Sequence, residues 1–170
     1  DFHKNLKDYQ DTILNFIINS HALLVANYLD KFGKELCDKR SNTISYSLNE
    51  EQIITTNINK TVFKFNEQII ETNLIGRFNI LNLLAVLTLL SAIGKKIDLN
   101  KIRKCETVKG RMDVIHFSPN IIIDYAHTSV AMLKAIKEIK RMTKGKLFLI
   151  FGAGGERDKS KRQEYGNIAL

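Results

Sequence analysis

The 170-residue chain is predicted to be an α/β protein, because three kinds of pattern follow one another along it. Its first part carries apolar residues at helical spacing, separated by a short apolar run of strand length. Residues 43–65 are rich in β-branched side chains and partly alternate apolar with polar positions, as antiparallel strands do. From residue 110 onward the pattern alternates strand, helix, strand, helix, which predicts a parallel sheet with right-handed crossovers.

The individual elements can be placed from local signals. Those predicted before residue 110 are an amphipathic helix over 6–19, a buried strand over 22–26, a helix over 28–37, antiparallel strands within 43–65 with a turn at Asn59 and Lys60, a buried helix over 79–93 ended by Gly94, and a short helix from Asp98 to about residue 105. Those predicted after it are strands over 121–123 and 147–151 and helices over 130–142 and from 163 onward. We place a domain boundary near 107–110, so residues 1–109 and 110–170 are assigned to two domains.

Composition narrows the function classes. The chain is 44% hydrophobic and carries a net charge of +8, which suits anionic small molecules such as nucleotides. Nucleic-acid binding is not predicted, because the basic residues are dispersed and do not interleave with aromatic ones. Cys37 and Cys105 are isolated and are interpreted as free cytosolic thiols. No apolar run reaches the roughly 20 residues that span a bilayer.

Polar residues at strand ends are the first candidates for chemistry. Asp124 closes an apolar strand and His127 follows it, at the sheet edge where α/β proteins bind ligands. Asp124 is suited to accept hydrogen bonds from ribose hydroxyls, or alternatively to cap the helix that begins near Ser129. Arg111 at the predicted junction could contact a phosphate or be merely structural.

A second candidate is the Gly-rich turn at residues 152–161. It matches neither the phosphate-binding loop of NTPases nor the dinucleotide fingerprint. Arg157 could hold a carboxylate in a bidentate fork, and Lys161 could neutralise a phosphate. The competing interpretation is a solvated basic helix start. Asn79 and Asn82 lie inside an apolar helix, where their amides either satisfy backbone groups or meet a ligand base.

Five segments together resemble a Mur ligase, most closely the UDP-N-acetylmuramoyl-tripeptide synthetase (MurE-type) branch. The matching segments, in register from end to end of the chain, are DFH to DY at 1–9, GRFNILN at 76–82, GRM at 110–112, DYAHT at 124–128 and GGERDKSKR at 154–162. The resemblance implies the second half of a central ATPase domain over 1–109, a sheet with helices and a small antiparallel section. The first half of a Rossmann-like C-terminal (glutamate ligase) domain would follow over 110–170.

The resemblance also implies a function. Such cytoplasmic enzymes of peptidoglycan synthesis use ATP and Mg²⁺ to join an amino acid, meso-diaminopimelate or L-lysine, to UDP-MurNAc-L-Ala-D-Glu through an acyl phosphate. By that likeness the ATP-binding residues are Asn79, Asn82, Arg111, Asp124 and His127. The residues that bind the incoming amino acid are Arg157 and Lys161. No nucleic acid and no membrane are implied as partners.

The chain departs from the family in ways that bear on catalysis. The family's phosphate-binding loop and magnesium-binding histidine would precede residue 1, and its carbamylated lysine falls at Ile13, which can neither be carbamylated nor bind metal. Ser129 stands where proline is usual. We expect a fragment with little or no ligase activity alone: a decayed gene product, or one complemented by an N-terminal half. The alternatives are a non-catalytic nucleotide-binding or interaction module, and a related ligase of the cyanophycin synthetase or folylpolyglutamate synthase type.

Overall fold

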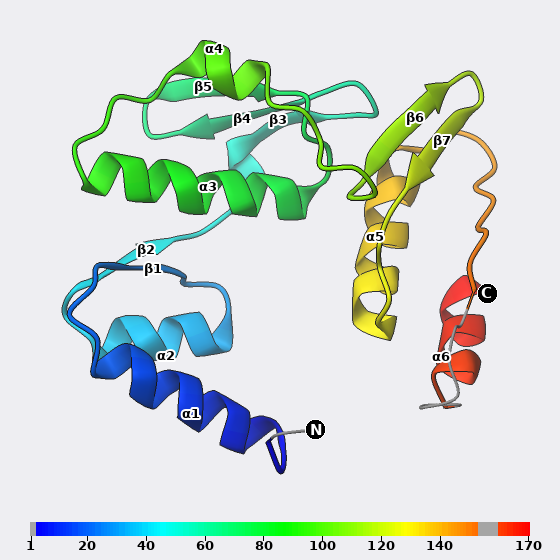
Figure 1. Ribbon diagram of the computed structural model, residues 1–170. Coiled ribbons are helices and arrows are strands. Elements are labelled where there is room, and N and C mark those ends of the chain that lie inside the picture. Colours follow the sequence, from blue (N-terminus) through cyan, green and yellow to red (C-terminus); the bar gives the residue numbers. More distant parts are fainter. Residues whose placement is uncertain (1–2, 153–159) are drawn as a thin grey trace. The chain divides into compact units, whose positions relative to one another are not determined.

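The computed structural model of the chain describes residues 3–152 and 160–170, and of Ser160 and Lys161 it describes the backbone only. The chain forms two compact units, Asp1–Gln52 with Ile80–Asp98, and Ile53–Asn79 with Leu99–Leu170 (Figure 1). Each unit draws on two stretches because helix α3 (Arg77–Ala92) begins in the second unit and continues in the first. The predicted division into domains 1–109 and 110–170 stays a prediction.

The first unit is built around a β–α–β motif. Its elements in chain order are α1 (Leu6–Ile18), β1 (Leu24–Asn27), α2 (Lys31–Lys39), β2 (Thr43–Tyr46) and a 3-10 turn at Glu50–Gln52. The side chains of Asn5 and Asp30 each accept backbone N–H groups from the first turn of the helix that follows. Both predicted helices are confirmed, and the strand predicted at 22–26 begins two residues later and ends one residue later than expected.

The strand at Thr43–Tyr46 corrects the sequence prediction. It pairs in parallel with β1, from Leu24 opposite Thr43 to Asn27 opposite Tyr46, so the antiparallel arrangement predicted for this stretch is wrong. Parallel strands need a crossover connection, and α2 provides it. β-Branched composition predicts that a segment is extended but says nothing about which strand it will pair with.

A close approach of α2 to β1 depends on Gly33. A Cβ atom added at this position would lie 2.1 Å from the carbonyl oxygen of Asn27 and 3.0 Å from its carbonyl carbon. Those atoms belong to the strand backbone and cannot rotate away as a side chain can. Glycine is therefore required at position 33 by packing of the helix on the strand.

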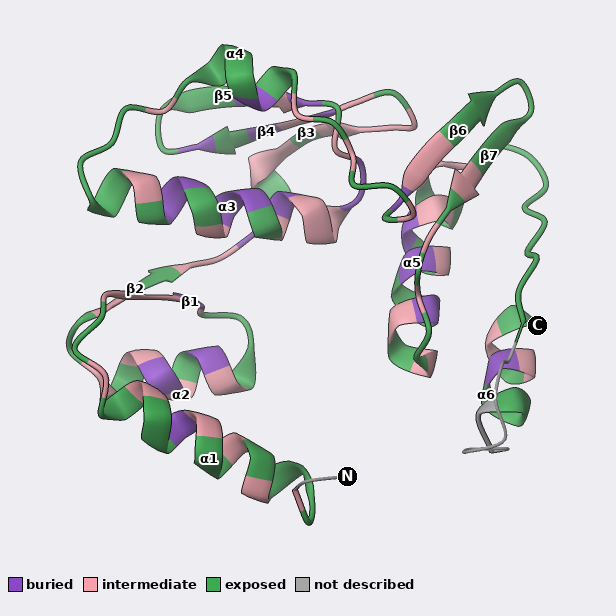
Figure 2. Ribbon diagram, in the orientation of Figure 1, coloured by how far each residue is buried: buried purple, intermediate pink, exposed green. Residues whose placement is uncertain are grey.

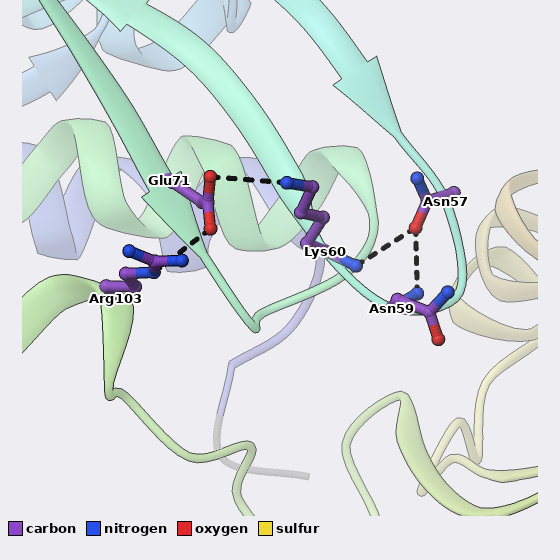
Figure 3. Close-up of polar contacts among 5 residues, drawn as sticks. All are labelled: Asn57, Asn59, Lys60, Glu71 and Arg103. Carbon is purple, nitrogen blue, oxygen red and sulfur yellow. Dashed lines mark hydrogen bonds and ion pairs between the residues drawn. The ribbon is translucent and has the colours of Figure 1, made fainter.

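The second unit contains a three-stranded antiparallel sheet. Its strands are β3 (Ile53–Thr56), β4 (Thr61–Phe65) and β5 (Gln68–Thr72), in the order β3-β4-β5. The prediction of antiparallel strands is confirmed here, and β5 is an addition to it. The Asn57 side chain shapes the β3–β4 turn by accepting N–H groups from Asn59 at 2.9 Å and Lys60 at 3.1 Å (Figure 3).

One ion-pair group ties this sheet to helix α4 (Leu99–Arg103). The Glu71 carboxylate lies 3.3 Å from the Lys60 ammonium and 3.1 Å from Nε of Arg103 (Figure 3). The side chains of Lys60 and Arg103 are 45% and 68% exposed, so solvent screens the attraction and each pair contributes little stability. The group orients the end of α4 on β5.

Helix α3 confirms the buried helix predicted over 79–93. Its buried side chains recur at helical spacing through the middle of the helix (Figure 2) and are Ile80, Leu83, Leu84, Leu87 and Thr88. Gly94 follows it in the left-handed region at φ +66°, the conformation expected of a helix-ending glycine.

The remaining elements are β6 (Asp113–Phe117), β7 (Asn120–Ile123), α5 (Ser129–Met142) and α6 (Ser160–Ala169). Strand β7 confirms the strand predicted at 121–123, but its partner is β6, with which it forms an antiparallel hairpin. The sequence reasoning missed β6, because Val114 and Ile115 stand side by side across a register shift and break the alternation of its apolar residues.

The second strand predicted after residue 110 is not formed. Within the described residues, 147–151 have no ladder partner and lie exposed (Figure 2); Phe148 is 82% and Ile150 98% exposed. A strand requires a neighbouring backbone to pair with. An apolar run predicts that a segment is a buried strand, but it does not supply the neighbouring strand with which the segment must pair. The predicted parallel sheet is therefore absent from the described part of 110–170, although the mixed α/β class is confirmed.

Candidate functional site

The predicted junction arginine and the predicted strand-end aspartate meet in one small structure. We call it the junction hook: the turn at residues 110–113 bonded to residues 124–126, which directly follow β7. The Met112 N–H donates to Oδ2 of Asp124 at 2.9 Å, and the Ala126 N–H donates to Oδ1 at 2.9 Å. The Tyr125 N–H donates to the Gly110 carbonyl at 2.7 Å. The hook thus joins two segments of the chain, with the Met112 N–H bonded to a carboxylate 12 positions away.

The turn of the hook has an unusual backbone. Gly110 and Met112 both lie at positive φ, +73° and +48°. A methionine rarely adopts this conformation, so the surroundings must stabilise it. Met112 is fully buried, and its N–H is bonded to Asp124. Burial and the carboxylate together fix the turn.

Asp124 therefore has a structural role that the sequence did not predict. The helix α5 is capped by Thr128, whose hydroxyl accepts the Ala131 N–H at 3.2 Å, so the interpretation of Asp124 as the helix cap is wrong. Asp124 accepts backbone groups from the hook instead. Each carboxylate oxygen can accept more than one hydrogen bond, so the half-buried side chain keeps capacity for a ligand hydroxyl.

An exposed row of three side chains lies along the hook. The Arg111 guanidinium carbon lies 4.9 Å from the centre of the Tyr125 ring, and that ring lies 5.1 Å from the His127 ring. Nδ1 of His127 lies 3.1 Å from the Tyr125 carbonyl oxygen. Tyr125 is 63% exposed, so an aromatic face, a guanidinium and an imidazole are open to solvent. Such a group can bind an anionic ligand that has a planar part.

The start of α3 lies against the hook through a shared core. Ile75, Met112 and Ala135 form its buried centre, and Phe78 packs against them. Asn79 in the first turn of α3 is half-buried, and its amide donates to the Ile75 carbonyl at 2.8 Å. One of the two interpretations of Asn79, that it satisfies backbone, thus holds for that donor. Its amide oxygen keeps lone pairs for other partners.

The other predicted site residues fall elsewhere. Asn82 is exposed on α3, one turn after Asn79, in the first unit. Arg157 lies outside the described residues, and so does the side chain of Lys161. Ile13 is half-buried in α1. The structure therefore gathers Arg111, Asp124 and His127, with Asn79 in the adjoining helical turn, and the binding roles of all these residues stay predictions.

Helix α6 contacts the residues that directly follow the hook. The Tyr165 hydroxyl donates to the His127 carbonyl at 2.6 Å, and its ring meets Phe151 edge-on at 6.3 Å between centres. The Ser129 hydroxyl donates to the Glu164 carboxylate. Sequence reasoning missed Tyr165 because no local pattern links it to a residue 38 positions earlier. Its only signal was an aromatic residue in an otherwise polar helix.

Metal-ligand clusters and membrane-spanning helices are both absent from the described part of the chain. Among the described residues, no group of three or more His, Cys, Asp or Glu side chains is arranged to hold a metal ion. In the same part of the chain, each helix is too short or too polar to cross a membrane.

Two family models match the sequence. The model described as the Mur ligase middle domain matches residues 1–90, and the model described as Mur ligase, glutamate ligase domain, matches residues 110–170.

Individual relatives extend over both matches. A UDP-N-acetylmuramoyl-L-alanyl-D-glutamate–2,6-diaminopimelate ligase from Buchnera aphidicola subsp. Schizaphis graminum is 35% identical over 193 residues, covering 99% of this chain and 39% of the relative. The enzyme of the same name from Aquifex aeolicus is 33% identical over 180 residues, covering 99% and 37%. The chain thus spans about two fifths of the length of the curated relatives it matches.

Solved structures show the same likeness. A structure of UDP-N-acetylmuramoyl-L-alanyl-D-glutamate–2,6-diaminopimelate ligase aligns with a TM-score of 0.65 at 25% identity, covering 99% of this chain and 39% of that one. The MurF ligase of Thermotoga maritima in complex with ADP aligns with a TM-score of 0.72 at 20% identity, covering 99% and 42%. The second likeness concerns the fold alone.

Proposed function

Because the chain belongs to the Mur ligase family, we propose that it forms part of a cytoplasmic, ATP-dependent ligase of peptidoglycan synthesis. The enzyme would add the third residue to UDP-MurNAc-L-Ala-D-Glu. The relatives that cover 99% of the chain carry 2,6-diaminopimelate in their names, so we propose meso-diaminopimelate, not L-lysine, as the amino acid. In this reaction the substrate carboxylate takes the γ-phosphate of ATP, and the amine then displaces phosphate from the acyl phosphate.

The junction hook is the observation that best supports a nucleotide role. Arg111 carries an exposed guanidinium that can pair with phosphate oxygens, and Tyr125 orients it from beside. Asp124 keeps lone pairs for a ribose hydroxyl, and Asn79 keeps an amide oxygen for an adenine amine. The sequence neighbours of these residues, Phe78, Met112 and Ala126, pack in one core, which supports a shared site for the adenosine end of ATP.

The described residues do not offer a binding site for magnesium. They contain no cluster of metal-ligating side chains, and Ile13 cannot coordinate an ion. We therefore assign no step on this chain to magnesium. Arg157 and Lys161 remain proposed to bind the carboxylate of the incoming amino acid.

The test is calorimetric titration of the purified chain with ATP. The informative variant is Arg111→Ala, because the three hydrogen bonds that define the hook do not involve the Arg111 side chain. Lys64→Ala is a matched control that removes one exposed positive charge from β4. We expect micromolar to millimolar binding that Arg111→Ala weakens several-fold and Lys64→Ala leaves unchanged. Equal weakening by both variants would indicate unspecific charge attraction. No heat from a cooperatively folded chain would refute the site.

Ile13 favours a second candidate, a nucleotide-binding module without turnover. The residue lies half-buried in α1, where an aliphatic side chain packs and has no chemistry to offer. This candidate predicts ATP binding whose affinity is the same with and without magnesium. Magnesium-dependent affinity, or ligase activity restored by a complementing N-terminal half, would exclude it.

A further inference from the structure

Helix α3 begins without a capping side chain of its own. The residue before it is Gly76, which lies at φ +89° and has no side chain to accept a backbone N–H. The first N–H groups of a helix have no partner within it, and most helices supply one locally through Ser, Thr, Asp or Asn. The acceptor for α3 must come from elsewhere in the chain.

Glu138 on α5 supplies that acceptor. The Arg77 N–H donates to Oε2 of Glu138 at 2.9 Å, across 61 positions of sequence. The other oxygen, Oε1, accepts from Nη1 of Arg141 at 2.5 Å. The carboxylate is thus bonded on both sides.

The surroundings of Glu138 make this bond more than a surface contact. Glu138 is only 7% exposed, although glutamate is seldom buried unless paired. Ala135 and Ile139 on the same helix belong to the core shared with Ile75 and Met112 of the junction hook region. The bond and the apolar core therefore join the segment at 75–79 to α5 at the same place.

We propose that Glu138 is a positioning residue of the nucleotide site: it caps the first turn of α3 from α5 and thereby sets the place of Asn79 relative to the junction hook. The consequences for Asn79 follow from its own bonds, because its N–H donates to the Gly76 carbonyl at 3.0 Å and its side chain to Ile75. If the bond to Glu138 were lost and the first turn of α3 moved, Asn79 would move with that turn. The inference rests on the proposed nucleotide function.

The same bond also restricts what the helix start can bind. A helix N-terminus attracts anions, because its free N–H groups and dipole favour negative charge. At α3 the protein's own carboxylate already lies on the Arg77 N–H. The Arg77 N–H is therefore already bonded within the protein and is not available to a phosphate oxygen of the nucleotide.

The test measures the hydrogen bond between Arg77 and Glu138 independently of ATP binding. In the unmodified chain, a through-hydrogen-bond scalar coupling between the Arg77 amide nitrogen and the Glu138 carboxyl carbon reports the bond directly. Hydrogen exchange of the Arg77 amide is then compared among Glu138→Ala, Glu138→Gln and Ile139→Ala. Ile139→Ala is the control for general loosening, because it removes only apolar contact from the same core.

We expect Glu138→Ala to speed exchange of the Arg77 amide roughly 10- to 100-fold beyond Ile139→Ala, and to weaken ATP binding several-fold. Glu138→Gln keeps an oxygen acceptor and should restore most of both properties. Absence of the coupling, or unchanged Arg77 exchange in Glu138→Ala, would overturn the cap. A lost cap with unaltered ATP affinity would overturn the positioning role. If the unmodified chain binds no ATP, the proposed function and the positioning role both fail, while coupling and exchange still test the cap.

Discussion

Asp124→Ala tests whether the junction hook is held together by a carboxylate. The substitution removes the two carboxylate acceptors of the hook, so the N–H groups of Met112 and Ala126 lose their partners. Met112 is fully buried at positive φ, so water cannot readily replace the lost partner of its N–H. The turn must then either open or keep an unsatisfied donor.

The expected loss can be estimated from these two bonds. A hydrogen bond to a charged acceptor contributes roughly 1.5–3 kcal/mol. Asp124 is half-buried, so water replaces part of what is lost at Ala126. We expect Asp124→Ala to lower the free energy of unfolding by about 2–4 kcal/mol. Asp124→Asn keeps one oxygen acceptor and should lose about half of that.

Urea unfolding followed by far-ultraviolet circular dichroism measures the loss, because the chain has no tryptophan to serve as a fluorescent probe. Asp11→Ala on α1 is the matched control, an exposed carboxylate whose removal should change stability by less than about 0.5 kcal/mol. If Asp124→Ala were no more destabilising than Asp11→Ala, the hook would not depend on the carboxylate. Loss of ATP binding in Asp124→Ala could then be assigned to a missing ligand contact.

Four further predictions concern stability. Gly33→Ala should destabilise the chain by about 3 kcal/mol or more, because its Cβ would collide with strand backbone. Gly166→Ala in α6 meets no atom within 4 Å and should stabilise by about 1 kcal/mol, so equal urea midpoints would contradict the packing argument. Tyr165→Phe keeps the ring but loses the bond to His127, so the unfolding free energy should fall by about 1 kcal/mol; an unchanged value would mean that the hydroxyl is not engaged. Burial raises the pKa of the Cys37 thiol. The folded state therefore prefers the protonated thiol, and this stabilisation is complete below the unfolded value of about 8.5 and lost as pH rises through the folded pKa. Thermal melts across the alkaline range should show a smaller decline for Cys37→Ala, and an identical decline would refute the shift.

Much of the local structure was predictable, because its causes are local. The apolar spacing of α1, α3 and α5 lies within each segment, and Asp98 and Gly94 mark helix ends by their own chemistry. The candidate residues Asp124 and His127 were selected from their place after a strand end, and Arg111 from its place at the predicted junction. The parallel pairing of β2 and the unpaired backbone at 147–151 were not predicted, because a strand's partner is not encoded within the strand.

The sequence by itself determined the family of this protein, its α/β class, its helices and the residues that gather at the junction hook. Only the tertiary structure decided which groups those residues contact. Asp124 accepts from the Met112 N–H 12 positions away, Tyr165 bonds to His127 across 38, and Glu138 caps α3 across 61. Periodicity and capping signals act over a few residues, whereas a buried hydrogen bond forms wherever folding brings donor and acceptor together.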